Sequence, residues 1–211
     1  MKGTSHVLIG AMAGAGAGLY LDADSLTLAI CASVGGAAGL VPDLDTNGLA
    51  SNAVTISKKK VKTPLLLMGV GVVCYAVYQF FQGTGSLSLK QLGLGIGMLI
   101  LSAVITQKRM LTLTGVGVIL GGVALDRTWL VLFGLFVVLA SFFPHRSYTH
   151  SLLGFGFFAL ILRMAEADLQ LEGLYLAGMA GYASHLIADM KLLPMNRRGV
   201  KLFAPIWNKE F

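Results

Sequence analysis

The run TWLVLFGLFVVLASFF (residues 128–143) leads directly into the polar segment PHRSYTHS (144–151), and a second apolar run, LLGFGFFALIL (152–162), follows at once. Two long apolar runs joined by a short polar turn are typical of consecutive membrane helices. The whole chain has this character, with 55% apolar and 12% charged residues and a mean hydropathy of +0.76. A soluble domain carries roughly 25% charged residues. The sequence therefore predicts an all-α, polytopic membrane helix bundle.

Eight apolar runs indicate a single integral membrane domain over residues 1–211 with about eight transmembrane helices. They lie at about 7–21, 26–41, 64–82, 91–106, 110–125, 128–143, 151–165 and 173–190. Several runs are shorter than the roughly 20 residues that a spanning helix needs, so a count of about six or seven is the alternative if glycine-rich runs are re-entrant. The spans at about 64–125 contain none of the polar motifs described below, and we expect them to be scaffold.

Basic residues indicate which ends of these spans face the cytoplasm. If the N-terminus is cytoplasmic and the chain crosses eight times, 13 of the 16 basic residues fall on the inner side, in line with the positive-inside rule. The formal charge of +6 then follows from topology and gives no reason to expect nucleic-acid binding. We predict a multi-pass protein of the cytoplasmic membrane with both termini in the cytoplasm.

Four polar motifs contain all the histidines, and the predicted topology places every motif at the cytoplasmic face. They comprise His6 in the first span, Asp43 and Asp45 after the second, His145 and His150 between the sixth and seventh, and His185 and Asp189 at the end of the eighth. Histidine and aspartate are metal ligands and acid/base groups, and polar groups inside a membrane segment are usually functional. The sequence predicts that these seven residues form one metal site facing the cytoplasm.

The spacing of the later motifs predicts their local geometry. A helix places His185 and Asp189 one turn apart on one face, where they can hold a metal or form a hydrogen bond between helices. His145 and His150 are five residues apart and can converge only if one of them lies in a turn. Pro144 favours a break at that point. The alternative for this motif is a polar interfacial loop without a ligand.

The earlier motifs leave more alternatives open. Asp43 and Asp45 are expected in an extended segment, which sends alternate side chains to one side. They could bridge two metals, or one could bind metal while the other acts as general base; the alternative is an aspartate-rich turn. His6 is expected to be a ligand or an orienting group, and Thr4 and Ser5 to cap the first helix.

Candidate substrate-binding residues flank these motifs. Arg146 can hold a phosphate bidentately, and Thr149 and Ser151 can cap the seventh span or bind a ligand oxygen. Arg197 and Arg198 can meet phosphate or anchor the end of the eighth span. The chain beyond them mixes basic, apolar and aromatic residues, so we expect it in the membrane interface beside the site.

Taken in order, these motifs carry a family resemblance. The matching segments are Thr4-Ser5-His6 with Ile9-Gly10, Pro42-Asp43-Leu44-Asp45, His145-Arg146-Ser147-Tyr148-Thr149-His150-Ser151, His185-Leu186-Ile187-Ala188-Asp189, Gly199-Val200 and Leu202-Phe203-Ala204-Pro205. The set resembles the bacterial membrane-bound metal-dependent hydrolases, also described as LexA-binding, inner-membrane-associated hydrolases. The resemblance covers residues 4 to about 207. It implies hydrolysis with a bound metal, a bacterial inner-membrane location and a cytoplasmic protein partner.

These observations lead to the hypothesis of a metal-dependent hydrolase acting at the cytoplasmic face. The HxxxD element is distantly similar to zinc-dependent phospholipases C and related nucleases, which favours a phosphoester of a membrane lipid or another amphiphile as substrate. We expect one or two divalent ions, zinc first, with manganese or magnesium if carboxylates dominate the ligands. Asp43 or Asp45 would take the proton of a metal-activated water, and Arg146 would hold the anionic headgroup.

Two other function classes compete with this hypothesis. A metal-ion or proton-coupled transporter also uses intramembrane histidine and aspartate, but it should place them near the bilayer midplane. A non-catalytic membrane scaffold that binds a cytoplasmic partner should lose its metal without losing its function.

Overall fold

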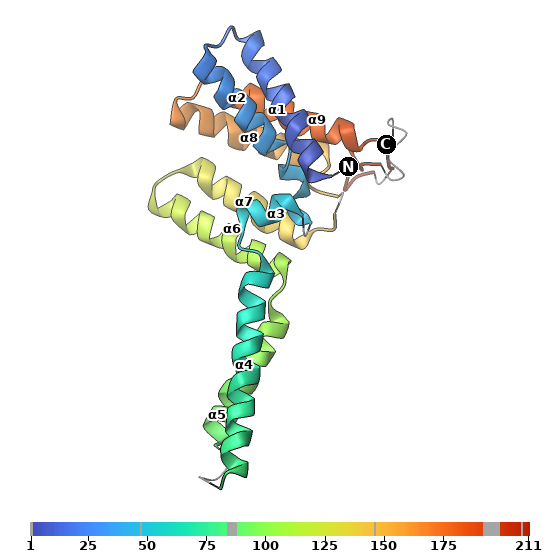
Figure 1. Ribbon diagram of the computed structural model, residues 1–211. Coiled ribbons are helices and arrows are strands. Elements are labelled where there is room, and N and C mark those ends of the chain that lie inside the picture. Colours follow the sequence, from blue (N-terminus) through green and yellow to red (C-terminus); the bar gives the residue numbers. More distant parts are fainter. Residues whose placement is uncertain (1, 47, 84–87, 146, 192–198, 208) are drawn as a thin grey trace. The chain divides into compact units, whose positions relative to one another are not determined.

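The computed structural model describes residues 2–46, 48–83, 88–145, 147–191, 199–207 and 209–211. Every regular element in these segments is helical (Figure 1), which confirms the all-α class. The elements are α1 (Gly3–Tyr20), α2 (Ser25–Ala38), the 3₁₀ helix η1 (Val41–Asp45), α3 (Leu49–Val54), α4 (Lys58–Phe81), α5 (Leu89–Val104), α6 (Gln107–Ala124), α7 (Thr128–Phe142), α8 (Leu152–Leu169) and α9 (Leu174–Asp189). The eight long helices fall on the eight apolar runs, while the short η1 and α3 were not expected.

Fewer than eight of these helices qualify as membrane spans by length and composition. In the described segments, Ser25–Asp45 and Lys58–Phe81 are long and apolar enough to cross a bilayer. The pair α5 and α6 is bent by 87° and adds a third span only if it is one broken span. The apolar α7 has 15 residues, which at 1.5 Å per residue is about 22 Å, less than the ~30 Å hydrocarbon core. A count of eight spans therefore stays a prediction.

The chain divides into two compact units, residues 1–54 with 111–211 and residues 55–110. The second unit contains α4 and α5, which pack closely at glycines: a Cβ on Gly69 would lie 3.0 Å from the carbonyl oxygen of Gly95. Small residues of this kind allow close backbone approach between membrane helices. This unit lies mostly within the region expected to be scaffold, and it holds none of the histidines.

In the first unit, α1, α2 and α9 cross at Gly35 of α2. A Cβ on Gly35 would lie 2.7 Å from the Cα of Gly14 on α1, and a Cβ on Gly181 of α9 would collide with the backbone of Gly35. Only residues without a side chain let three helices approach so closely. Because His6 lies about two turns before Gly14 and His185 about one turn after Gly181, this crossing brings distant parts of the sequence side by side.

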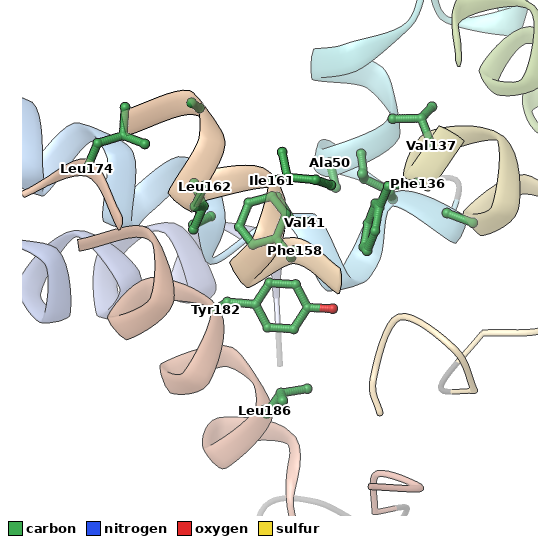
Figure 2. Packing of buried hydrophobic residues seen from close by; sticks show 14 of the residues in the cluster. Val41, Ala50, Phe136, Val137, Phe158, Ile161, Leu162, Leu174, Tyr182 and Leu186 are labelled. Carbon is green, nitrogen blue, oxygen red and sulfur yellow. The ribbon is translucent and has the colours of Figure 1, made fainter. Parts of the chain in front are cut away.

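The apolar core of the first unit gathers side chains from η1, α3, α7, α8 and α9 (Figure 2). Tyr182 of α9 is completely buried, and its ring lies 5.2 Å from that of Phe158 on α8. Its hydroxyl donates a hydrogen bond to the carbonyl oxygen of Thr149. A buried tyrosine hydroxyl needs such a partner. The bond fastens the loop between α7 and α8 to α9, so it helps to place His150.

Candidate metal centre

His185 is fully buried, and its ring orientation is set by the end of α2. Its Nδ1 lies 2.7 Å from the carbonyl oxygen of Gly39. A carbonyl oxygen only accepts, so Nδ1 carries the proton and the lone pair of Nε2 is available for a ligand. Asp189, one turn later on α9, lies with its Oδ2 3.8 Å from that Nε2. The pair shares one helix face, as the spacing predicts.

His150 meets His185 from the loop before α8. The two Nε2 atoms are 3.2 Å apart. The hydroxyl of Thr149 donates to Oδ2 of Asp45 at 3.4 Å, and its oxygen lies 3.1 Å from Nδ1 of His150. With the hydroxyl proton directed to Asp45, the oxygen accepts the Nδ1 proton of His150, and the Nε2 lone pair also faces the centre. Such outer hydrogen bonds commonly orient metal-binding histidines.

Two carboxylates lie against the imidazoles of His150 and His185, and with them they form a central group of four donor atoms. Oδ1 of Asp43 lies 3.7 Å from Nε2 of His150 and 3.8 Å from Nε2 of His185. Oδ2 of Asp189 lies 3.8 Å from Nε2 of His150 as well as from His185. Four tetrahedral ligands at zinc bond lengths of ~2.0–2.2 Å are about 3.3–3.6 Å apart. Each carboxylate oxygen, together with the two imidazole nitrogens, therefore lies at nearly the spacing of three ligands of one tetrahedral ion.

His6 lies directly against this group. Its ring stacks on that of His185, with centroids 3.9 Å apart, and its Nε2 lies 3.4 Å from Oδ1 of Asp189. The side chain is 1% exposed, and neither ring nitrogen forms a hydrogen bond within the described part of the chain. A buried polar group without a hydrogen bond is costly, and such groups often mark a ligand or ion site. His6 is thus placed as a further ligand or as an orienting group for Asp189.

The expectation that Asp43 and Asp45 share one side of an extended segment is wrong. They belong to the 3₁₀ helix η1, which has about three residues per turn, so side chains two residues apart point in different directions. Pro42 near the start of η1 fixes φ in the helical range, which explains the difference. Asp43 faces the central group, whereas Asp45 accepts a 2.8 Å hydrogen bond from Nδ1 of His145. The two carboxylates therefore have separate roles.

His6, Asp43, His150, His185 and Asp189 are called the cluster from here on. His145 lies at its outer side. Its side chain is 40% exposed, against 1% for its partner Asp45. Its ring stands edge-on to that of His150, with centroids 5.0 Å apart. The loop between α7 and α8 is not helical here, which is how two histidines five residues apart converge. One donor atom each from Asp43, His145 and His150 forms a second group within 4.8 Å, and this group shares members with the first.

A cavity of about 240 Å³ opens beside the cluster. Asp43, Thr46, His145 and Asp189 are its polar lining residues, and Leu40 and Leu49 are among the apolar ones. The cavity gives small ligands access to the carboxylates of Asp43 and Asp189 and to His145.

The other predicted residues have different places. Ser151 caps α8, because its Oγ accepts from the N–H of Gly154 at 3.2 Å. Of the two predicted roles, the structure therefore shows the helix cap. The expected cap by Thr4 and Ser5 is wrong: α1 begins at Gly3, and no side chain caps it. Arg146, Arg197 and Arg198 lie outside the described residues. Two residues that hold the site, Gly39 and Tyr182, belong to none of the predicted motifs, although a tyrosine three residues before His185 in an apolar helix is a usable signal.

A protein-family model, the YdjM inner membrane protein, matches residues 1–211. The chain belongs to the YdjM inner membrane protein family. Membership makes it a protein of a bacterial membrane family, in agreement with its composition and with the candidate spans. No curated protein and no solved structure matches the chain.

Proposed function

We propose that this member of the YdjM family is a metal-dependent hydrolase that cleaves a phosphoester of a lipid or other amphiphile. The proposal is carried by five distances between 3.2 and 3.8 Å: the one between the two imidazole nitrogens, and those from each of the two carboxylate oxygens to both nitrogens. Two neutral imidazoles whose lone pairs face each other repel unless a cation lies between them. Buried groups are rarely left in such an arrangement.

The donor set favours zinc, because mixed imidazole and carboxylate ligands suit this ion; manganese and magnesium are the alternatives. A bound divalent ion would lower the pKa of a coordinated water and stabilise charge on a phosphoryl oxygen. The overlapping donor groups are compatible with one or two ions. Asp43, Asp45 and Asp189 bring negative charges that such ions would balance.

The carboxylates of Asp43 and Asp45 are proposed to have different roles. Asp43 is 18% exposed and lines the cavity, which supports a role in accepting a proton from an attacking water. Asp45 is enclosed by His145 and Thr149, and it acts as a positioning residue. Arg146, next to His145 in the sequence, is proposed to hold the phosphate of the substrate.

We further propose that the protein is multi-pass and that the cluster faces the cytoplasm. The cluster residues come from the start of α1, from η1 after α2, from the loop before α8 and from the end of α9. A transporter would instead need polar groups along a path across the bilayer. This placement at helix ends supports the hydrolase over the transporter. Binding of LexA or another cytoplasmic protein would be an additional property of the same face.

The test is hydrolysis of a bacterial lipid extract by protein purified into nanodiscs, with products identified by mass spectrometry. His185→Ala removes a central ligand, and Ser141→Ala is the matched control, because Ser141 is also buried but bonds to Thr112 and Val138 away from the cluster. We expect phosphorylated products from the wild type and the control, and none from His185→Ala or after chelation. Equal activity in His185→Ala would contradict the metal-dependent hydrolase. The non-catalytic membrane scaffold would then be the remaining hypothesis.

A further inference from the structure

The C-terminal loop, residues 199–207 and 209–211, is fastened beside the cluster at two points. The first residue of α8, two positions after His150, donates its N–H to the carbonyl oxygen of Leu202 at 2.8 Å. Lys191, which follows the end of α9, donates its N–H to the carbonyl oxygen of Phe211 at 3.0 Å. The loop is thus held by the same two segments that carry His150 and Asp189.

An apolar groove of about 270 Å³ lies between this loop and the start of α8. Its walls are Leu152 and Leu153 on one side and residues 202–207 on the other. Ile206 is 95% exposed, and Trp207 and Leu153 are each more than half exposed. Ile206 and Trp207 belong to a non-helical loop, and large apolar side chains that remain so exposed mark a contact with lipid or with another partner.

The charges of the loop that lines the groove indicate the partner. Nζ of Lys209 lies 5.4 Å from the centre of the Trp207 ring, and Lys201 belongs to the same loop. Glu210 pairs with Lys191 at 3.2 Å, and the hydrogen bond from Lys191 holds the pKa of the Glu210 carboxyl below its usual value. That pair is therefore neutral, and among the described residues of the loop Lys201 and Lys209 contribute positive charge. Aromatic and aliphatic side chains with lysines beside them are typical of segments in the interface of an anionic membrane.

We propose that this groove receives an acyl chain of an anionic membrane phospholipid and so brings the phosphate of that lipid to the metal cluster. The inference rests on the proposed function and narrows its substrate to a phospholipid. Leu152 of the groove wall lies two residues after His150, so one segment carries both a groove residue and a cluster residue. A soluble phosphoester would make no use of the groove.

The two tryptophans of the chain allow a direct test. Trp129→Phe leaves Trp207 as the only indole, next to the groove. Trp207→Phe leaves Trp129, which donates to Asp168 at 2.8 Å, as the matched control. Both variants are placed in three kinds of nanodisc. Two contain phosphatidylglycerol or phosphatidylcholine brominated near the middle of the chains, and the third contains a lipid with a quencher on its headgroup. We expect bromine to quench Trp207 more than the headgroup quencher does, and brominated phosphatidylglycerol to quench it more than brominated phosphatidylcholine.

Insertion of the loop into the bilayer without a chain in the groove would also give some quenching, so a groove variant is needed. Leu153→Gln, made in the Trp129→Phe background, places an amide in the groove wall at an exposed position. We expect it to halve the quenching of Trp207 or reduce it further, and to remove the preference for the anionic lipid. The same substitution in the Trp207→Phe background should leave the quenching of Trp129 unchanged. Equal quenching in the presence and absence of Leu153→Gln, or stronger quenching by aqueous iodide than by acyl bromine, would overturn the proposal.

Failure of the groove and failure of the hydrolase can be told apart. Quenching of Trp207 should persist in His185→Ala, since the groove contains no metal ligand. If the quenching persists but neither the wild type nor any variant hydrolyses lipid, the proposed hydrolase activity is wrong. If lipid is hydrolysed without selective quenching of Trp207, the proposed binding of an acyl chain in the groove is wrong. With both intact, Leu153→Gln should raise KM for phosphatidylglycerol by about tenfold at unchanged metal content, which corresponds to a loss of about 1.4 kcal/mol of binding.

Discussion

Asp45→Asn should weaken metal binding although Asp45 is not in the central donor group. In the wild type, Asp45 accepts from His145 at 2.8 Å and from Thr149 at 3.4 Å. An asparagine keeps the size of the side chain and can still accept from His145. Its amide NH₂ then faces the Thr149 oxygen, so the hydroxyl proton must turn away from residue 45 and toward Nδ1 of His150. That nitrogen becomes an acceptor, and its proton moves to Nε2, where it blocks the lone pair that faces His185.

The size of the effect follows from this rearrangement. Metal binding in the variant must first restore the other tautomer against an unfavourable amide–hydroxyl contact. Loss of an outer hydrogen-bonding partner typically lowers metal affinity about 10- to 100-fold, which is roughly 1.4–2.8 kcal/mol. Removal of a direct ligand, as in His185→Ala, should cost considerably more.

The assay is competition for zinc against a chromophoric chelator in detergent solution. Thr149→Val removes the hydroxyl that links Asp45 to His150, and it should weaken binding by a similar factor. The double variant should be no weaker than the weaker single variant, because both act on one chain of hydrogen bonds. Unchanged affinity in Asp45→Asn, or additive losses in the double variant, would refute the assignment of Asp45 as a positioning residue.

Three further predictions concern the fold and the topology. Gly35→Ala should destabilise the protein by about 1–3 kcal/mol in denaturant unfolding, because its Cβ would overlap the backbone of α1; an unchanged midpoint would contradict the crossing of α1, α2 and α9. Asp24→Ala should lower the thermal midpoint at neutral pH, because hydrogen bonds from Thr27 hold the pKa of Asp24 below its usual 3.8. A group with a lowered pKa stabilises above its unfolded value and loses this effect as the pH falls through the folded one, so the difference from wild type should shrink below about pH 4; a constant difference would show that the charge is not involved. Reporter fusions after Lys62 and after Arg198 should both report the cytoplasm, and a periplasmic signal from either would contradict the proposed orientation.

The sequence predicts the long helices well, because their apolar runs are continuous and separated by polar or charged turns. It fails at η1, where a proline followed by two aspartates has too little periodicity to distinguish an extended segment from one and a half turns of 3₁₀ helix. That local error matters for function, since it decides which carboxylate faces His150 and His185. The short α3 is missed for the same reason: six residues are too few to show a period.

The residues of the cluster could be named from the sequence because charge placement put all the motifs at one membrane face. Their hydrogen-bond partners could not. The carbonyl oxygen of Gly39 reaches His185 only because three helices cross at Gly35, and this contact joins segments 146 residues apart. The bond between Asp45 and Thr149 joins residues 104 positions apart. Such contacts depend on packing between helices, which single-sequence periodicity does not contain.

Elemental analysis of the purified protein shows whether the cluster of histidines and aspartates holds a metal ion. Protein prepared without chelators should carry one or two equivalents of a divalent metal by elemental analysis, zinc first. His150→Ala and His185→Ala should lose it, while Ser141→Ala should retain it. Wild-type protein without stoichiometric metal, or full retention in both histidine variants, would contradict the account.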